Sequence, residues 1–193
     1  MGICILSFSA RTHGNCAQIG KLIQSLSEDA VFHDFSSFAL HGCGGCDYQC
    51  FSEEGACPYL DDMEARLLED ITHSDLTYFV IPNYCDYPCS NYFIFNERSL
   101  CCFQRRPDLL DRYEKVPKRA IVVSNTEEEN FRKALSYQSY GGVETLFLSA
   151  KQFGKTSIRG DLLTEERAVQ AITDFVKTPQ GEEAVGAGES KRK

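Results

Sequence analysis

Ten cysteines are the first residues of this 193-residue chain that could do chemistry. Four of them share one short segment with the spacing C-x2-C-x3-C-x6-C: Cys43, Cys46, Cys50 and Cys57. Four thiolates this close in sequence can bind zinc tetrahedrally or hold an iron–sulfur cluster, and the glycines between them let the chain wrap tightly. The segment is therefore compatible with a cluster, a zinc ion, or free thiols packed in a loop.

A second candidate for chemistry is the polar stretch 9–16, directly after an apolar run. It supplies hydroxyls from Ser9 and Thr12, an amide from Asn15 and the charge of Arg11. At the start of a helix, such a loop also offers unpaired backbone N–H groups and the positive end of the helix dipole, so it can bind phosphate. A polar turn that only caps the helix is the alternative.

Three other phosphate-binding arrangements do not match this loop. No Gly-Lys-Ser/Thr closes it, so it is not a Walker A loop, and it lacks the G-x-G-x-x-G of a Rossmann dinucleotide site. A low-molecular-weight tyrosine phosphatase needs a cysteine closer to the arginine than Cys4 is to Arg11.

Alternating apolar runs and amphipathic stretches predict the elements that must position these residues. Strands are expected at 3–8, 31–35, 76–81, 119–123 and 145–148. Helices are expected at 15–27, from Asp61 to Ile71, and at 89–103, 127–139 and 165–176. This alternation predicts a doubly wound α/β sheet. Such a sheet binds its ligand beyond the carboxyl ends of its strands, so the loops after the first, third and fourth strands are the ones of interest.

The overall composition limits the partners and the location. With 20 Lys and Arg residues against 28 Asp and Glu, the net charge is −8, and no local basic patch is present, so we expect no binding to nucleic acid or to an anionic membrane. The N-terminus lacks the features of a signal peptide, and no apolar run reaches the roughly 18 residues of a membrane span, so a cytoplasmic location with reduced thiols is expected. We expect a single domain over 1–177 and a disordered tail over 178–193.

The loop after the first strand resembles that of a known family. It carries Ser9-x-Arg11-x-x-Gly14-Asn15, which is similar to the phosphate loop Gly-Ser-x-Arg-x-x-x-Asn-Thr of the NADPH-dependent FMN reductase family. The resemblance extends over roughly residues 3–176. The segment 82–84 (Pro-Asn-Tyr) is similar to the family's Pro-x-Tyr segment, which lines the isoalloxazine ring, and 96–98 (Asn-Glu-Arg) to its Ile-Asp-Arg. Two positions depart from the pattern: Phe8 replaces its glycine, and Cys16 replaces the hydroxyl residue after the asparagine.

The resemblance implies a flavodoxin-like α/β fold, a three-layer sandwich with a five-stranded parallel sheet of order 2-1-3-4-5. FMN is the implied cofactor. Its phosphate would be bound by Ser9, Arg11, Gly14, Asn15 and Cys16. Its ring would lie against Pro82, Asn83, Tyr84 and Cys85, with Tyr87 near the rim. Its pyrimidine edge would be bound after the fourth strand, by Ser124 and Asn125.

The resemblance also implies an activity. Members of this family are oxidoreductases that pass electrons from NAD(P)H through FMN to a small acceptor such as a quinone, a flavin or an azo dye. No side chain need act as an acid or a base, because the flavin carries the chemistry and the protein positions it. Cys85 and Cys89 lie beside the implied ring, which leaves room for a thiol relay. A homodimer is also implied, because flavin sites of this family often border a second subunit.

Two alternatives remain open on the sequence. The cysteine segment is similar to that of the iron–sulfur flavoproteins, and Asp61-Asp62-Met63 follows it as in that group, although its second gap is one residue longer. The second hypothesis is therefore an electron-transfer flavoprotein with a [4Fe-4S] cluster and a ferredoxin-type donor. The third is a cofactor-free thiol sensor or binding protein on the same fold, supported by Phe8 and Cys16.

Overall fold

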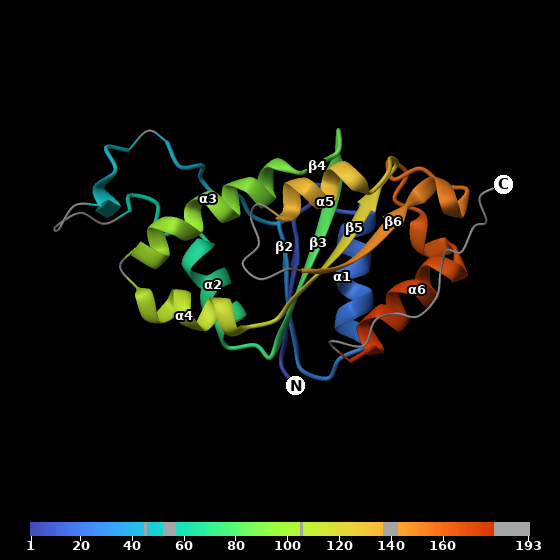
Figure 1. Cartoon of the computed structure of the whole chain (residues 1–193), viewed down its shortest axis with the longest axis horizontal. Helices are drawn as coiled ribbons and strands as arrows, with labels where there is room; N and C mark the ends of the chain where they lie inside the picture. The colour runs from blue at the N-terminus through green and yellow to red at the C-terminus, as the bar shows by residue number, and fades with distance from the viewer. Residues whose placement is uncertain (45, 52–56, 105, 137–142, 180–193) are drawn as a thin grey trace.

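A parallel sheet between two layers of helices forms the centre of the protein, as a computed structural model describes it for residues 1–44, 46–51, 57–104, 106–136 and 143–179 (Figure 1). The parallel strands are β1 (Ile3–Ser7), β2 (Ala30–Asp34), β3 (Leu76–Tyr84), β5 (Lys118–Ser124) and β6 (Glu144–Ser149). They lie side by side in the order β2-β1-β3-β5-β6. With the short β4 left out, this is the predicted order of a flavodoxin-like sheet.

The third strand is longer than the sequence predicted. Its expected end at residue 81 is wrong, because Pro82 continues β3 and pairs in register with Val123 of β5. The Phe8 N–H donates to the carbonyl of Val80 at 3.0 Å, beyond the last residue of β1. The backbone N–H of a residue at position 82 would point toward β1, as the backbone polar groups of residue 80 do. Because β1 has already ended there, none of its carbonyls needs this N–H, so a proline, which has none, is tolerated. The chain then turns back as the antiparallel β4 (Tyr87–Pro88), which was not predicted.

Two helices cover one face of the sheet and the remaining α-helices of the described chain cover the other (Figure 1). The first layer contains α1 (Asn15–Ser25) and α6 (Glu166–Lys177). The second contains α2 (Glu64–Thr72), α3 (Ser90–Gln104), α4 (Pro107–Lys115) and α5 (Glu129–Ser136). Three short 3-10 helices complete the elements: η1 (Gln49–Phe51), η2 (Ala150–Phe153) and η3 (Leu162–Thr164).

All the predicted helices are found, with ends that differ by a few residues. Helix α4 was not predicted; it is short and begins with Pro107 in its first turn. Helix α2 begins at Glu64 after the N-cap residue Met63, so the predicted cap Asp61 is wrong; the Glu64 N–H donates to the carboxylate of Asp62 at 3.1 Å. The predicted end of the helix 127–139 and most of the tail 178–193 lie outside the described residues.

No helix of the described chain combines the length and the apolar character that a membrane span requires.

Phe8, which stands where the family pattern has a glycine, belongs to the core. Its ring is fully buried and packs against Phe35 at 4.8 Å and Tyr92 at 5.2 Å between ring centroids. Because the side chain points into the layer beneath α3, it leaves the loop that follows free to face the carboxyl edge of the sheet.

A buried ion pair fastens the cysteine-containing segment to α3. Arg98 is only 1% exposed, and its guanidinium donates to Asp62 at 2.7 Å, to the His41 carbonyl at 2.8 Å and to the Tyr59 carbonyl at 3.1 Å. One arginine therefore ties both ends of the segment 41–62 to the second helical layer.

Removing this arginine is expected to cost much of the stability of the fold. Arg98→Ala leaves the carboxylate of Asp62 buried without its partner, which typically destabilises a protein by about 3 to 5 kcal/mol. The free energy of unfolding from urea titrations measures the loss. Arg106→Ala, which removes an exposed arginine paired with Glu69, is the control and should cost less than about 1 kcal/mol. Equal losses in the two variants would contradict the proposed role of Arg98.

A second buried acid, Glu64, lies beneath α3. Burial raises the pKa of Glu64 to about 8, so the folded protein holds this carboxyl protonated at neutral pH. Its Oε1 lies 2.8 Å from the hydroxyl of Ser99, which is itself 2.7 Å from the carbonyl of Phe95. A protonated carboxyl can donate to the Ser99 oxygen, which then donates to this carbonyl.

The raised pKa predicts a stability that depends on pH. An unfolded glutamate ionises near pH 4.5 and the folded one near pH 8, so the stabilising contribution is complete below about pH 4.5 and is lost as the pH rises to 8. Glu64→Gln stays neutral, and urea unfolding should show its stability relative to the wild type increasing from pH 5 to pH 8. Glu97→Gln, a change at an exposed position of α3, the helix that covers Glu64, should show no such trend. A parallel pH dependence of wild type and Glu64→Gln would contradict the assignment.

Candidate functional site

Two loops meet at the carboxyl edge of the sheet, where the strand order reverses between β1 and β3. Ser7 of β1 pairs in register with Val80 of β3, so the chain that leaves β1 lies beside the last residues of β3. A cavity of about 40 Å³ lies here. It is lined by Ser9, Arg11, Gly14, Asn15, Cys16, Pro82, Asn83, Tyr84, Val123, Ser157 and Ile158. The structure thus brings together the residues predicted in 9–16 and 82–84.

The loop before α1 is a tight turn held by its own groups. The Ser9 hydroxyl accepts from the Arg11 N–H at 3.2 Å, and the Gly14 N–H donates to the Arg11 carbonyl at 3.1 Å. Gly14 is the N-cap of α1 and no side chain caps the helix. The first turn therefore has backbone N–H groups without a side-chain cap, together with the positive end of the helix dipole.

Arg11 and Asn15 both bind main-chain atoms from the connection between β6 and α6. The Asn15 amide donates to the Ser157 carbonyl at 3.0 Å and accepts from the Leu162 N–H at 3.0 Å. The Arg11 guanidinium donates to the carbonyl of Ile158. These contacts were not predicted. One signal was available, because the last parallel strand also ends at the carboxyl edge and its following loop must begin there.

Cys16 is a buried thiol beside the cavity. Burial raises the pKa of Cys16 above its usual value, so the side chain is a neutral group at the start of α1. It can offer the site an apolar sulfur surface but no negative charge.

The β3–β4 hairpin carries the aromatic part of the site. Cys85 and Asp86 form its turn, both with positive φ (51° and 67°), which matches a two-residue hairpin turn. Tyr84 lines the cavity and is 52% exposed, whereas Cys85 points to solvent and does not line it. Burial raises the pKa of Tyr84, so its phenol is neutral. Tyr84 lines the same cavity as Ser9, so the hairpin lies beside the loop after β1.

Asp86 is a residue of the site region that the sequence did not single out. Its carboxylate accepts from the Thr126 hydroxyl at 2.6 Å, so it fastens the hairpin to the loop after β5.

Asn83 is the most buried polar side chain of the hairpin. Its amide nitrogen donates to the hydroxyls of Ser124 at 2.8 Å and Thr126 at 3.1 Å. Its Oδ1 is buried and has no hydrogen-bond partner among the residues that the structure describes. Ser124, which was predicted to bind the ligand, does not line the cavity. It orients Asn83 by accepting the hydrogen bond from its amide nitrogen. Asn125 also acts indirectly: its Oδ1 accepts from the Ser157 N–H at 2.8 Å.

Cys89, the predicted relay partner of Cys85, is buried at the start of α3. Its thiol donates to the Phe8 carbonyl at 3.2 Å, and burial raises the pKa of Cys89 to about 11. The exposed Cys85 and the protonated Cys89 give no sign of a reactive pair.

The cysteine segment is not arranged around a metal in the part of the chain that the structure describes. Cys50 is buried, and the other three predicted ligands, Cys43, Cys46 and Cys57, are partly exposed. Within the described residues, no group of three or more His, Cys, Asp or Glu side chains is placed to hold a metal ion. The described residues thus give the predicted cluster no support.

Cys57 instead contacts α3. Its side chain packs against the core cluster that contains Cys101 and Cys102. The neighbouring Cys102 thiol and the Arg98 guanidinium lower the pKa of the Cys101 thiol. Both of these adjacent helix cysteines are buried.

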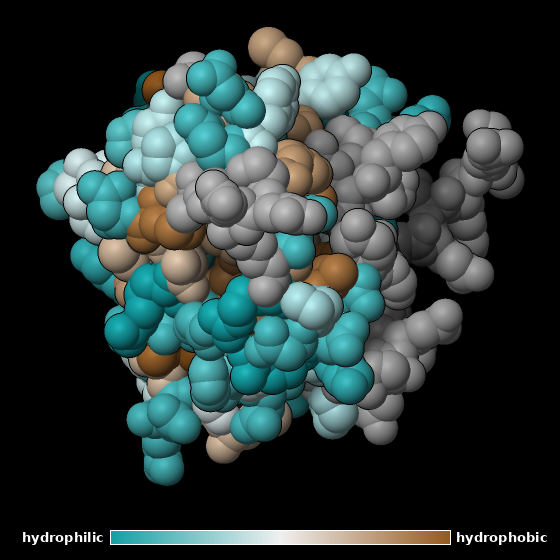
Figure 2. Space-filling model, turned by 90° about the vertical axis from the view of Figure 1, so that its left-hand side faces the viewer, coloured by the Kyte–Doolittle hydropathy of each residue, from teal (hydrophilic) through white to brown (hydrophobic). Residues whose placement is uncertain are grey.

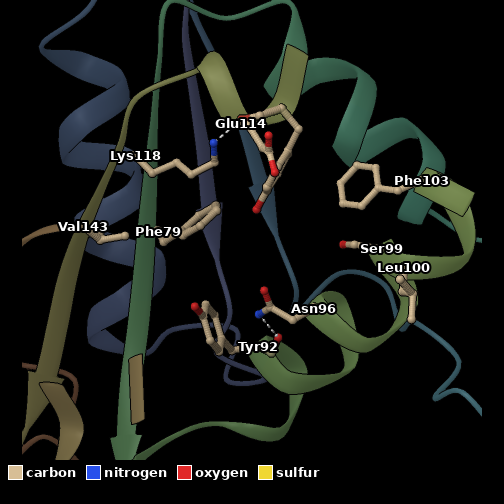
Figure 3. Close-up of a pocket in the computed structure, with 10 residues that line it drawn as sticks. Phe79, Tyr92, Asn96, Ser99, Leu100, Phe103, Glu114, Lys118 and Val143 are labelled. Atoms are coloured by element: carbon tan, nitrogen blue, oxygen red, sulfur yellow. Dashed lines mark hydrogen bonds between the residues drawn. The ribbon is translucent and has the colours of Figure 1, made fainter. Parts of the chain in front are cut away.

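A larger cavity of about 250 Å³ lies elsewhere, between α3, α4 and the strands β3 and β5 (Figure 3). Phe79, Tyr92 and Phe103 give it aromatic walls, and Lys118 enters from β5. The Lys118 ammonium donates to the carbonyls of Tyr113 and Val116, and burial lowers its pKa to about 8. Figure 2 views the end of the molecule that carries α3 and α4, where apolar atoms lie among polar ones. This cavity contains none of the predicted site residues.

Comparisons with known proteins identify the fold. No protein-family model matches the sequence, and no curated protein is similar to it. Several solved structures are similar to the whole chain. The Trp repressor binding protein from Bacillus subtilis has a TM-score of 0.58 and 14% identity, over 92% of this chain and 98% of that one.

Two further structures are similar to the same extent. An azoreductase from Bacillus anthracis str. Sterne has a TM-score of 0.57 and 11% identity, over 91% of this chain and 100% of that one. A flavone reductase has a TM-score of 0.56 and 12% identity, over 91% of this chain and 62% of that one. At these identities the likeness shows a shared fold, and together with the strand order it confirms the flavodoxin-like architecture.

Proposed function

We propose that this chain is an FMN-dependent oxidoreductase that takes electrons from NAD(P)H and passes them to a small acceptor such as a quinone or a flavin. The observation that carries the proposal is the cavity at the strand reversal, where Arg11 and the start of α1 lie beside Asn83 and Tyr84. A helix start that can bind phosphate, next to an aromatic wall, suits a flavin mononucleotide. The names of two proteins that share the fold, azoreductase and flavone reductase, support the reaction class.

The phosphate end of FMN fits the loop before α1. This end carries a dianion, and the loop offers a guanidinium, the Ser9 hydroxyl and a helix start without a side-chain cap. Hydrogen bonds between charged groups of this kind are the strong ones in proteins. The departure at Cys16 removes one oxygen ligand and leaves these donors in place.

The ring of FMN carries a donor that matches the buried side-chain oxygen of Asn83 in the hairpin. Asn83 is 8% exposed and lines the cavity, and its side-chain oxygen has no hydrogen-bond partner in the described part of the chain. A buried acceptor without a donor is unfavourable, and an N–H group of a flavin ring would satisfy it.

The cavity has room for only one end of FMN, the phosphate. A volume of about 40 Å³ has room for about three water molecules, which suits a phosphate and not a three-ring system. Most of the ring would therefore lie outside it, over the exposed side chains of Tyr84 and Tyr87, and only its N–H edge would reach Asn83 at the cavity wall. A second copy of the chain could cover these tyrosines, and we include a homodimer in the proposal.

The side chains of the site position the cofactor and exclude water. FMN, when bound, accepts two electrons from NAD(P)H and delivers them to the acceptor. Arg11 and α1 would hold its phosphate, and Asn83, oriented by Ser124, would fix its ring. Tyr84 and Cys16 stay neutral because their pKa values are raised by burial, so neither repels the phosphate.

A visible absorption spectrum of the anaerobically purified chain, before and after adding FMN, tests the proposal. We expect flavin bands with bound FMN, and oxidation of NADH or NADPH that depends on an added quinone. Flavin bands with a broad brown shoulder, bleached by dithionite, would favour the iron–sulfur alternative and its ferredoxin-type donor. A colourless protein that takes up no FMN would favour the cofactor-free alternative.

Arg11→Ala is expected to weaken FMN binding and to spare riboflavin, which has no phosphate. Loss of a charge-assisted hydrogen bond corresponds to a factor of about 10 to 100 in Kd. Titration by quenching of flavin fluorescence measures both ligands. Arg66→Ala, an exposed arginine on α2, is the control and should change neither Kd. An equal loss of affinity for riboflavin would show that Arg11 does not bind the phosphate.

Asn83→Ala is expected to weaken FMN and riboflavin by the same factor of about 10, because both carry the ring that Asn83 would bind. The same titrations provide the measurement. Ser124→Ala keeps the amide and removes only the hydroxyl behind it, so its effect should be smaller. If Asn83→Ala impaired only FMN, the assignment of this residue to the ring would be wrong.

A further inference from the structure

The connection between β6 and α6 lies across the predicted phosphate loop. We call its residues 155–161 the strap; they lie between η2 and η3. Ser157 and Ile158 line the cavity, and their carbonyls accept hydrogen bonds from Asn15 and Arg11. The proposed function assigns Arg11 to the phosphate of FMN, and the family resemblance implies the same role for Asn15. In the structure, main-chain oxygens of the strap therefore occupy the donors that phosphate oxygens would use.

Gln18 of α1 links the strap to the loop before α1. Its amide nitrogen donates to the Gly160 carbonyl at 2.6 Å and to the His13 carbonyl at 3.1 Å. Gln18 does not line the cavity, so it acts on the site through the main chain that it holds, at Gly160 of the strap and at His13 of the loop. It is a positioning residue, and its loss should loosen the strap without removing a phosphate donor.

Gly160 permits the close approach of the strap to the loop. Its φ of +73° is a conformation that favours glycine, and a Cβ at this position would lie 2.9 Å from the carbonyl oxygen of His13. A side chain here would push the strap away from the loop, since the atom it would meet belongs to the backbone.

The strap is held by hydrogen bonds and ion pairs more than by burial. None of the residues 155–161 is buried, and Ile158 at its centre is 68% exposed. At its base, Lys155 pairs with Glu165 at 3.1 Å, and the next residue after the strap, Leu162, is fully buried. Opening the strap would therefore expose little apolar surface while its base stays anchored, which is typical of segments that open locally.

We propose that the strap is a gate on the phosphate site: the phosphate of FMN reaches Arg11 and Asn15 only after the Ser157 and Ile158 carbonyls release them. This inference rests on the proposed function. It adds that the strap limits the rate at which phosphate-bearing flavins bind, and that Gln18 and Gly160 set this rate. Riboflavin needs none of these donors, so the gate does not slow it.

Gln18→Ala in the full chain tests the gate, with Gln24→Ala as the matched control. Gln24 lies on the same helix and also donates to a carbonyl, that of Ala30, but far from the strap. Two quantities are measured: the rate of tryptic cleavage at the exposed Arg159 of the strap in the protein without flavin, and the association rate constants of FMN and riboflavin by stopped-flow fluorescence.

We expect Gln18→Ala to raise the cleavage rate and the FMN association rate by about fivefold, the factor for the loss of one hydrogen bond, and to leave riboflavin unchanged. Gly160→Ala should act in the same direction, and Gln24→Ala should change nothing.

Four results would overturn the gate. Cleavage at Arg159 that neither variant accelerates would show that Gln18 and Gly160 do not hold the strap. Faster cleavage with an unchanged FMN association rate would show that the strap is not a gate. An equal increase in the association rates of FMN and riboflavin would show the same, and both results would leave the proposed function intact. No FMN binding by any variant would overturn both the gate and the proposed function.

Discussion

The in-register pairing of β1 with β3 is the constraint on which the site depends. Ser7 pairs with Val80, so the chain leaves β1 beside the last residues of β3, and the strand order reverses between them. This reversal opens space at the carboxyl edge of the sheet, because the helices that follow the two strands leave on opposite faces. The loop 9–14 and the hairpin that carries Tyr84 meet in this space, and neither would form a site alone.

Polar side chains then hold the loops of the protein in place. Arg98 binds the segment 41–62 to α3, and Asp86 binds the hairpin to the loop after β5. The strap adds a third attachment, through Asn15 and Gln18, directly over the predicted phosphate donors. The cavity is small because of this third attachment, so one feature accounts both for its size and for the proposed control of access.

The sequence predicted the elements with a strong local signal and missed those that depend on tertiary placement. The parallel strands leave short apolar runs in the sequence, so all five were located, although β3 runs on past Ile81 because the proline that follows lies beyond the end of β1. Helix α4 escaped prediction because it is short and directly follows a longer helix.

The site residues divide in the same way, into those with a local sequence signal and those that depend on tertiary placement. The loop residues around Arg11 and Asn83 were predicted from local motifs, and the structure places them around one cavity. Ser157 and Ile158 were not, because they reach the cavity through the last connection, far along the chain.

The central claim is that the loop before α1 binds the phosphate of FMN, and ³¹P NMR of FMN titrated with the full chain tests it most directly. The account predicts a bound phosphorus signal distinct from that of free FMN, and its loss in Arg11→Ala. A signal that stays at the position of free FMN would contradict it.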